Sequence, residues 1–252
     1  MRKKEKNKDI RLWAVLVWLI VWQLVSMALN SDILLVSPLK VVIRLLELTG
    51  EISFWKSIVY SLLRIGGGFL TALLAGSLWA ALSARFLLVR QLLAPVVLIT
   101  KTIPVASFII LALVWFSSRN LAVLISFLMV FPVIYTNVLN GIIQTDRELL
   151  EMAEVFSVAA GRRIRYIYLP QVMPYLRAGC SVALGLCWKS GIAAEVIGMP
   201  KGSIGERLQQ AKVYLDTADL FAWTLVIVVV SLLFEWLFLW LLDRSTRAVE
   251  RM

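Results

Sequence analysis

The sequence predicts an all-α integral membrane protein with about six transmembrane helices in one domain. Hydrophobic residues make up 60% of the 252 residues, and the mean hydropathy of +0.84 is far above that of globular proteins. The apolar residues form runs long enough to cross a bilayer, which takes about 20 helical residues. The net charge is +10, but the basic residues stand mainly at the ends of these runs. This placement is typical of membrane orientation rather than of nucleic-acid binding.

The chain begins with a basic segment, residues 1–11, which leads into an apolar run at residues 12–29. A signal peptide also begins in this way. The run is long for a signal sequence, however, and no small-x-small cleavage site precedes Asn30. We therefore expect a retained first span and a cytoplasmic N-terminus at residues 1–11. Residues 12–242 would then form a single transmembrane domain, followed by a cytoplasmic tail at residues 243–252.

A short amphipathic helix is expected between the first two spans. Pro38 opens it, and apolar residues then recur at helical spacing, at Leu39, Val42, Ile43 and Leu46. We expect this helix to lie on the outer membrane surface.

Five further spans are expected, at residues 58–84, 92–116, 121–143, 177–198 and 220–242. The first of these has a small residue at every fourth position, at Gly68, Ala72, Gly76 and Ala80. Small residues let helix backbones approach closely in lipid. The stripe therefore predicts close packing, either against another span of the same subunit or against a second copy.

Residues 145–175 are polar and basic and lie between two predicted spans. Thr145 and Glu148 stand in the S/T-x-x-E relation that caps helix starts. An apolar face then follows at Leu149, Leu150, Ala153 and Phe156. A second helical piece, residues 160–169, is expected to end at Pro170. These features predict an amphipathic helical hairpin that serves as a docking surface.

The distribution of basic residues predicts which side of the membrane the hairpin faces. Sixteen Lys and Arg residues lie in residues 1–11, the turn at Arg85, the hairpin and the tail. Seven lie in the opposite loops and three lie within spans. Cytoplasmic loops carry the excess of Lys and Arg, so the hairpin is expected in the cytoplasm.

The hairpin resembles the coupling loop of binding-protein-dependent ABC importer permeases. The family pattern is E-A-A, a Gly four residues on, and then I-x-L-P. Residues of this chain at the family spacing are Glu151, Ala153, Ile167, Leu169 and Pro170. Met152 and Ser157 depart from the pattern, and we expect Gly161 to take over the turn from the missing Gly. The resemblance extends from about Pro38 to the end, and it is greatest to the nitrate, sulfonate and taurine branch.

The resemblance implies a type I importer permease fold and a multi-pass protein of the bacterial inner membrane. It implies two copies of a separate ABC ATPase, a second permease copy that forms a homodimer, and an extracytoplasmic solute-binding protein. The hairpin residues Glu151, Ala153, Ser157, Gly161, Ile167, Leu169 and Pro170 would couple to the ATPase. No G-x-x-x-x-G-K-[ST] motif is present. The chain is thus expected to bind no cofactor, and its partner would use ATP and Mg²⁺.

The resemblance also implies a path for a small, anionic solute such as a sulfonate, taurine or nitrate. Charges at membrane depth usually face a cavity or a partner. The candidate path residues are Lys101, Pro104, Trp188, Lys189 and Glu195. Alternatively, Lys101 reaches the headgroups and Lys189 pairs with Glu195 or Glu235. Arg64 either joins the path or extends to the membrane interface.

Other functions are less consistent with the sequence. One alternative stays open, namely that the same type of importer carries a pyrimidine or thiamine precursor or another small nutrient. A secondary transporter would show internal repeats, and none is evident. An embedded enzyme needs clustered His, Asp or Glu, whereas the chain has no His. The two cysteines, Cys180 and Cys187, are expected to be small buried packing residues rather than metal ligands.

Overall fold

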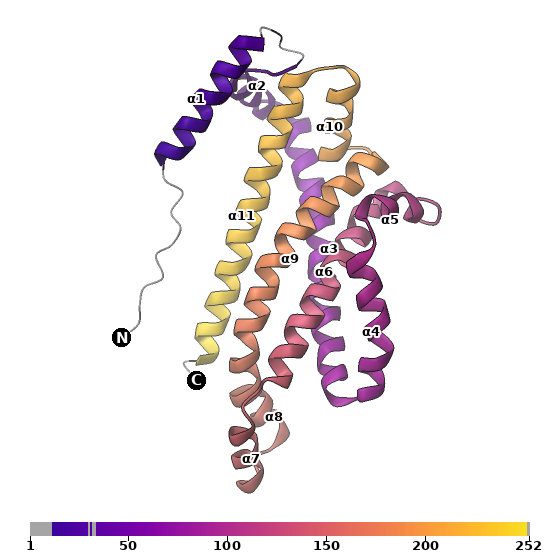
Figure 1. Cartoon of the computed structure of the whole chain (residues 1–252), viewed down its shortest axis with the longest axis vertical. Coiled ribbons are helices and arrows are strands. Elements are labelled where there is room, and N and C mark those ends of the chain that lie inside the picture. The colour runs from indigo at the N-terminus through magenta and orange to yellow at the C-terminus, as the bar shows by residue number, and fades with distance from the viewer. Residues whose placement is uncertain (1–11, 30, 32–33, 251–252) are drawn as a thin grey trace.

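The computed structural model describes residues 12–29, 31 and 34–250, so the predicted cytoplasmic segment 1–11 lies outside the described residues. Every regular element in the described part is helical (Figure 1). The elements are α1 (Leu12–Leu29), α2 (Pro38–Thr49), α3 (Ile52–Arg85), α4 (Leu87–Thr102), α5 (Val105–Ala112), α6 (Ser118–Ile143), α7 (Arg147–Val155), α8 (Ala160–Arg163), the π-helical turn η1 (Ile164–Tyr168), α9 (Leu169–Gly198), α10 (Ile204–Val213) and α11 (Thr217–Glu250).

Among the described residues, four helices are long and apolar enough to cross a membrane: Ile52–Arg85, Ser118–Ile143, Ala160–Gly198 and Thr217–Thr246. The bent pair of α4 and α5 makes five if it is counted as one span. The remaining predicted span is α1, an apolar helix of 18 residues. That length is near the lower limit for crossing the hydrocarbon core. Figure 1 shows α1 standing apart from the bundle, near α2.

The centre of the bundle is α6, which packs most extensively against α3 and α9. The small-residue stripe of α3 faces α6: a Cβ at Gly68 would lie 2.6 Å from the carbonyl oxygen of Val123. Ala72 and Ala80 are fully buried. The two helices are also joined by a buried hydrogen bond of 3.0 Å from the Tyr135 hydroxyl to Ser83 Oγ. The stripe therefore contacts a span of the same subunit.

The span predicted at residues 92–116 is broken rather than continuous. The chain forms α4 and α5, which meet at a bend of 106°. Ile103 and Pro104 have extended backbone at the break. Proline disfavours helical conformation in the residue before it, so α4 ends there. As Figure 1 shows, α5 then projects sideways from the bundle. Pro95, by contrast, is accommodated inside α4.

The predicted helix end at Pro170 is also wrong. The chain remains helical from Ala160 to Gly198, a length of 39 residues. Just before Pro170 the hydrogen bonds change to the π pattern, in which the backbone N–H of Leu169 bonds to the carbonyl of Ile164. Pro170 then lies in the first turn of α9, where its missing N–H costs little. The second half of the hairpin and the spanning helix α9 are therefore one continuous rod.

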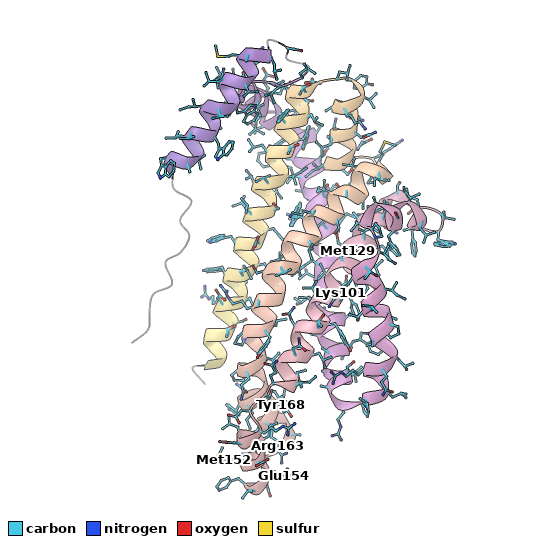
Figure 2. All side chains as sticks on the ribbon, viewed as in Figure 1. Lys101, Met129, Met152, Glu154, Arg163 and Tyr168 are labelled. Carbon is cyan, nitrogen blue, oxygen red and sulfur yellow. The ribbon has the colours of Figure 1, made fainter. Side chains whose placement is uncertain are left out.

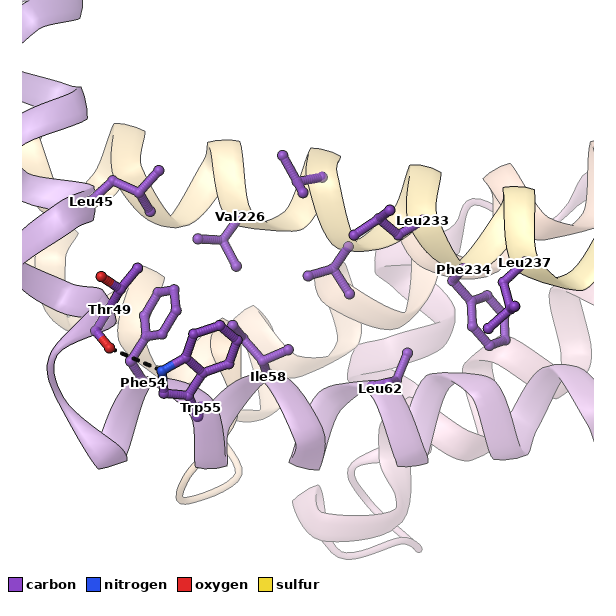
Figure 3. A pocket seen from close by; sticks show the side chains of 12 residues that line it. Leu45, Thr49, Phe54, Trp55, Ile58, Leu62, Val226, Leu233, Phe234 and Leu237 are labelled. Carbon is purple, nitrogen blue, oxygen red and sulfur yellow. Dashed lines mark hydrogen bonds between the residues drawn. The ribbon is translucent and has the colours of Figure 1, made fainter.

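The two ends of the bundle differ. The hairpin formed by α7 and α8 lies at one end, and α2 and α10 lie at the other (Figure 1). Between α2, α3 and α11 runs an apolar groove of about 430 Å³ (Figure 3). Trp55 closes its α2 end by donating its indole N–H to the carbonyl of Thr49 at 3.0 Å.

Candidate functional site

The hairpin starts with a cap that differs from the predicted one. Asp146 is the N-cap residue of α7, and its carboxylate accepts a hydrogen bond of 2.9 Å from the backbone N of Glu148. Thr145 is buried instead, and its hydroxyl donates to the carbonyl of Gly141 at 3.2 Å. The predicted pairing of Thr145 with Glu148 is therefore wrong. Asp also suits the positive end of the helix dipole, so the sequence contained two valid caps in succession.

The turn after α7 is centred on Ser157, which has a left-handed backbone with a φ of 49°. The N–H of Val158 bonds to the carbonyl of Ala153 at 2.8 Å, and that of Ser157 bonds to the carbonyl of Glu154 at 2.9 Å. Together these bonds form a Schellman motif, whose left-handed position glycine usually fills. Gly161 lies inside α8, so it does not take over the turn as expected. The chain keeps the turn that the family glycine would make and places a serine in it.

Further hydrogen bonds hold the hairpin in a fixed shape. The Arg163 side chain donates from Nε to the carbonyl of Val158 at 2.7 Å, which ties α8 to the turn. The Gln171 side chain accepts from the backbone N of Asp146 at 2.9 Å, which ties the start of α7 to α9. The Tyr175 hydroxyl donates to Gln144 Oε1 at 2.6 Å. The hairpin is thus attached at several points to the helices that continue into the bundle.

The hairpin presents apolar side chains to its surroundings. The most exposed of them, each at least half exposed, are Met152, Val155, Phe156, Ile164 and Tyr166. Phe156 and Val155 are 74% and 81% exposed, which is unusual for large apolar side chains in water. Figure 2 places Met152, Glu154 and Arg163 together at this tip of the molecule. We name the five apolar residues Met152, Val155, Phe156, Ile164 and Tyr166 the hairpin surface.

The predicted coupling residues occupy different positions. Glu151 is exposed beside the hairpin surface, and Leu169 is partly exposed. Ile167 and Pro170 are half-buried where the hairpin joins α9. Ala153, however, is only 1% exposed. Its small side chain therefore packs inside the hairpin and does not contact a partner directly.

Two of the predicted path residues lie on an open side of the bundle, at the broken span and on α9. Lys101 is exposed on α4, where its Nζ donates to Thr136 Oγ1 of α6 at 3.0 Å (Figure 2). Pro104 begins α5 at the break. Lys189 is exposed on α9, between Leu186 and the half-buried Ala193. Lys101 is thus exposed while bonded to α6, and Lys189 is exposed on the surface of α9.

Two other predicted path residues, Trp188 and Glu195, are buried inside the chain rather than exposed like Lys101 and Lys189. Trp188 is 2% exposed, with its ring 5.9 Å from that of Phe234, and Glu195 is 0% exposed. Seven positions apart, these residues share one face of α9, the face that packs on α3 and α11. Lys189, one position further on, points elsewhere. Lys189 and Glu195 therefore lie on different faces of one helix and do not pair within this chain.

Arg64 contacts protein groups at the α10 end rather than an open space. Its Nη1 donates to the carbonyl of Arg119 at 2.6 Å and to Asn120 Oδ1 at 2.7 Å. Cys180 and Cys187 are fully buried, and Cys187 Sγ lies 3.4 Å from the carbonyl of Ile65. Both thiols are packed between helices of the bundle.

Residues 68–251 match the family described as "Binding-protein-dependent transport system inner membrane component". This is more than half of the chain, and the chain belongs to that family. It is therefore a membrane-embedded permease component of an ABC importer with the type I permease fold. The helical bundle and the hairpin at the I-x-L-P segment are consistent with this membership.

Several curated relatives cover most of the chain. The taurine transport system permease protein TauC of Escherichia coli (strain K12) is 25% identical over 87% of this chain and 80% of its own length. The putative aliphatic sulfonates transport permease protein SsuC of Bacillus subtilis (strain 168) is 28% identical over 94% and 86%. The riboflavin transport system permease protein RibX of Chloroflexus aurantiacus is 26% identical over 86% and 82%.

Proposed function

We propose that this chain forms the path of an ATP-driven importer for a small anionic solute of the sulfonate or taurine kind. Two copies enclose the path, and each carries an ATPase on its hairpin. The N-terminus and the hairpin face the cytoplasm, and a solute-binding protein delivers the solute at the α10 end. Relatives named for taurine and for aliphatic sulfonates support the solute class.

The observation that carries the ATPase assignment is the hairpin surface. Large apolar side chains are exposed on a rigid tip, with the acidic Glu151 beside them, at the end of a continuous 39-residue helix. Exposed apolar patches rimmed by charge are typical of protein-binding surfaces. A hairpin fixed by its own hydrogen bonds binds a partner without first being ordered, which lowers the cost of association.

For the path we propose Lys101 and Lys189 as the groups that attract the anion. Each is exposed on a spanning helix, and a cation at membrane depth is costly unless it faces water or an opposite charge. The break at Pro104 places backbone of extended conformation near Lys101, which is tolerated where a helix lines a cavity. Trp188 and Glu195 have no part in this lining because they are buried.

The test is co-purification of the ATPase encoded beside this chain with the wild type and with Glu151→Lys. Glu154→Lys is the matched control, since it reverses an exposed charge on the same helix at a position outside the family pattern. We expect the ATPase to be lost from Glu151→Lys and kept by Glu154→Lys, with equal membrane insertion. Failure of the ATPase to associate with the wild type would instead favour a secondary transporter.

The relative named for riboflavin supports a second candidate, a vitamin-like solute without strong negative charge. Uptake of labelled taurine into vesicles that contain the whole complex, with unlabelled butanesulfonate, nitrate or riboflavin as competitors, distinguishes the two. Competition by the sulfonate supports the anion path, and competition by riboflavin alone contradicts it.

A further inference from the structure

At the α10 end of the bundle, the carboxyl group of Glu195 is fully buried where three helices meet. Its Oε2 accepts a hydrogen bond of 2.6 Å from Ser61 Oγ of α3 and one of 3.2 Å from the backbone N of Gly205 in α10. The Ser61 hydroxyl in turn accepts from the backbone N of Ile204 at 3.0 Å. Because Glu195 stands in the last turn of α9, one carboxyl group joins α3, α9 and α10. We name Glu195, Ser61, Ile204 and Gly205 the buried latch.

The geometry of the buried latch is tightly constrained. A Cβ at Gly205 would lie 2.3 Å from that of Glu195, so the first turn of α10 touches α9 directly. The backbone N–H groups of Ile204 and Gly205 belong to the start of α10, where the helix dipole favours a negative group. Oε1 of Glu195 has no hydrogen-bond partner in the described part of the chain. A tilt of α10 away from α9 would therefore remove the bond from Gly205 and leave the buried carboxyl group with Ser61 as its one partner among the described residues, which is unfavourable.

The rod that carries Glu195 ends in the hairpin. Residues Ala160–Gly198 are helical without interruption, and Arg163 near the other end ties α8 to the turn after α7. A displacement of one end of a continuous helix moves the other end with it. Glu195 and the α8 half of the hairpin consequently lie at the two ends of one continuous helix, and α7 is tied to that helix by Gln171.

The α10 end exposes apolar side chains of its own. Val213, Tyr214 and Leu215 are between 66% and 80% exposed, and Leu215 has a left-handed backbone with a φ of 57°. Leu215 takes the left-handed position of the Schellman motif that ends α10, in which the N–H of Asp216 bonds to the carbonyl of Ala211 at 2.9 Å. A partner that presses on this turn would push α10 against the buried latch.

We propose that Glu195 is a positioning residue that makes α10 and the α9 rod move as one body, so that docking at the α10 end shifts the hairpin at the other. This inference rests on the proposed function, in which the solute-binding protein docks at the α10 end. Without the buried latch α10 would tilt alone, and docking of the binding protein would no longer shift the hairpin or stimulate the ATPase.

The experiment uses the complete complex of permease and ATPase, reconstituted in lipid nanodiscs. Its binding protein is loaded in turn with taurine, butanesulfonate or nitrate, and the solute that stimulates the wild type is used for the variants. Ser61→Ala removes the hydroxyl that joins Glu195 to Ile204. Ser57→Ala is the matched control, because Ser57 is equally buried one turn away but its hydroxyl bonds only to the Ser53 carbonyl of its own helix.

We expect Ser61→Ala to keep its basal ATPase rate and to lose about tenfold of the stimulation by loaded binding protein, a typical size for coupling between sites. Ser57→Ala should be stimulated like the wild type. Glu195→Gln, whose amide oxygen can accept both hydrogen bonds, should keep most of the stimulation, whereas Glu195→Ala should lose it. A merely structural role would lower basal rate, assembly and stimulation together.

Equal stimulation of Ser61→Ala and wild type overturns the proposal while leaving the proposed function intact. Loss of assembly in Ser61→Ala but not in Ser57→Ala also overturns it, since the buried latch would then serve only stability. A wild-type complex that no loaded binding protein stimulates contradicts the proposed function itself.

Discussion

Arg44 of α2 and Asp219 of α11 form an ion pair between segments 175 residues apart in the chain. Arg44 also bonds Glu47 Oε2 at 2.9 Å within its own helix. The hydrogen bonds that Arg44 donates to Asp219 and, to a smaller extent, to Glu47 raise the pKa of its guanidinium above the ordinary value, so the group stays charged. The pair fixes the short α2 to the last spanning helix.

Breaking this pair should loosen the α10 end. In a double-mutant cycle of Arg44→Ala and Asp219→Ala, we expect a coupling free energy of about 1 kcal/mol, the upper range for partly exposed pairs. Thermal unfolding in detergent measures it. Glu47→Gln, at the more exposed partner, should change little. Strict additivity of the two single changes would show that the pair contributes nothing.

The contact of α3 with α6 predicts opposite outcomes at adjacent glycines. Gly68→Ala would place its Cβ 2.6 Å from the Val123 carbonyl, and the helices would have to separate. Overpacking of this kind costs about 1–3 kcal/mol of unfolding free energy. Gly67→Ala meets nothing within 4 Å, so the better helix propensity of Ala should leave the fold unchanged or slightly more stable. Thermal unfolding of both variants measures the difference. Equal melting temperatures would contradict the close packing of α3 against α6 at Gly68.

Ser157→Gly should stabilise the hairpin. Relief of the left-handed conformation gains about 1–2 kcal/mol. The greater freedom of Gly in the unfolded chain offsets about 0.5–1 kcal/mol of this. We expect slower hydrogen exchange at the Val158 amide, which bonds to the Ala153 carbonyl. Ser157→Ala keeps the strain and is the control; faster exchange in Ser157→Gly than in Ser157→Ala would refute the argument.

Substitutions at Lys189 test whether this residue lines the proposed solute path. Lys189→Gln should raise the KM for uptake of an anionic solute about tenfold, the effect of losing one charge-assisted hydrogen bond. Lys189→Arg keeps the charge and should restore most of the uptake. Vesicle uptake assays measure both variants, with Lys56→Gln on the exposed surface of α3 as a control for net charge. A KM unaffected by Lys189→Gln would exclude Lys189 from the path.

Much of the fold could be predicted because apolar runs and caps are local signals. The span expected at 121–143 is α6, Ser118–Ile143, and the amphipathic helix expected at 39–48 is α2, Pro38–Thr49. The apolar face predicted for α2 is exposed at Leu39 and Leu46, each 66%, and the residue that packs inside the protein is Val41, which was not singled out. In a membrane protein both faces can be apolar, so hydrophobicity alone does not orient a helix.

The site was harder to predict because it depends on direction rather than on spacing. The coupling motif located the hairpin, but the burial of Ala153 follows from how α7 packs on its neighbours. Pro104 and Pro170 have the same local chemistry, yet one ends a helix and the other does not. The difference lies in the π turn before Pro170, which no local sequence pattern predicts. Ser61 was missed because an isolated serine in an apolar run is unremarkable.

The π turn at Ile164–Tyr168 also affects the direction in which the hairpin points relative to the faces of α9. Each residue advances an α-helix by about 100°, and a π turn takes up one extra residue without breaking the rod. The hairpin surface is thereby rotated, relative to the faces of α9, from where an unbroken α-helix would point it. Removal of one residue here other than Ile164 and Tyr166 would keep every span and every residue of the hairpin surface and still turn the tip away from its partner. The angular register between α9 and the rest of the hairpin surface is thus set within a five-residue turn that itself contributes two residues, Ile164 and Tyr166, to that surface.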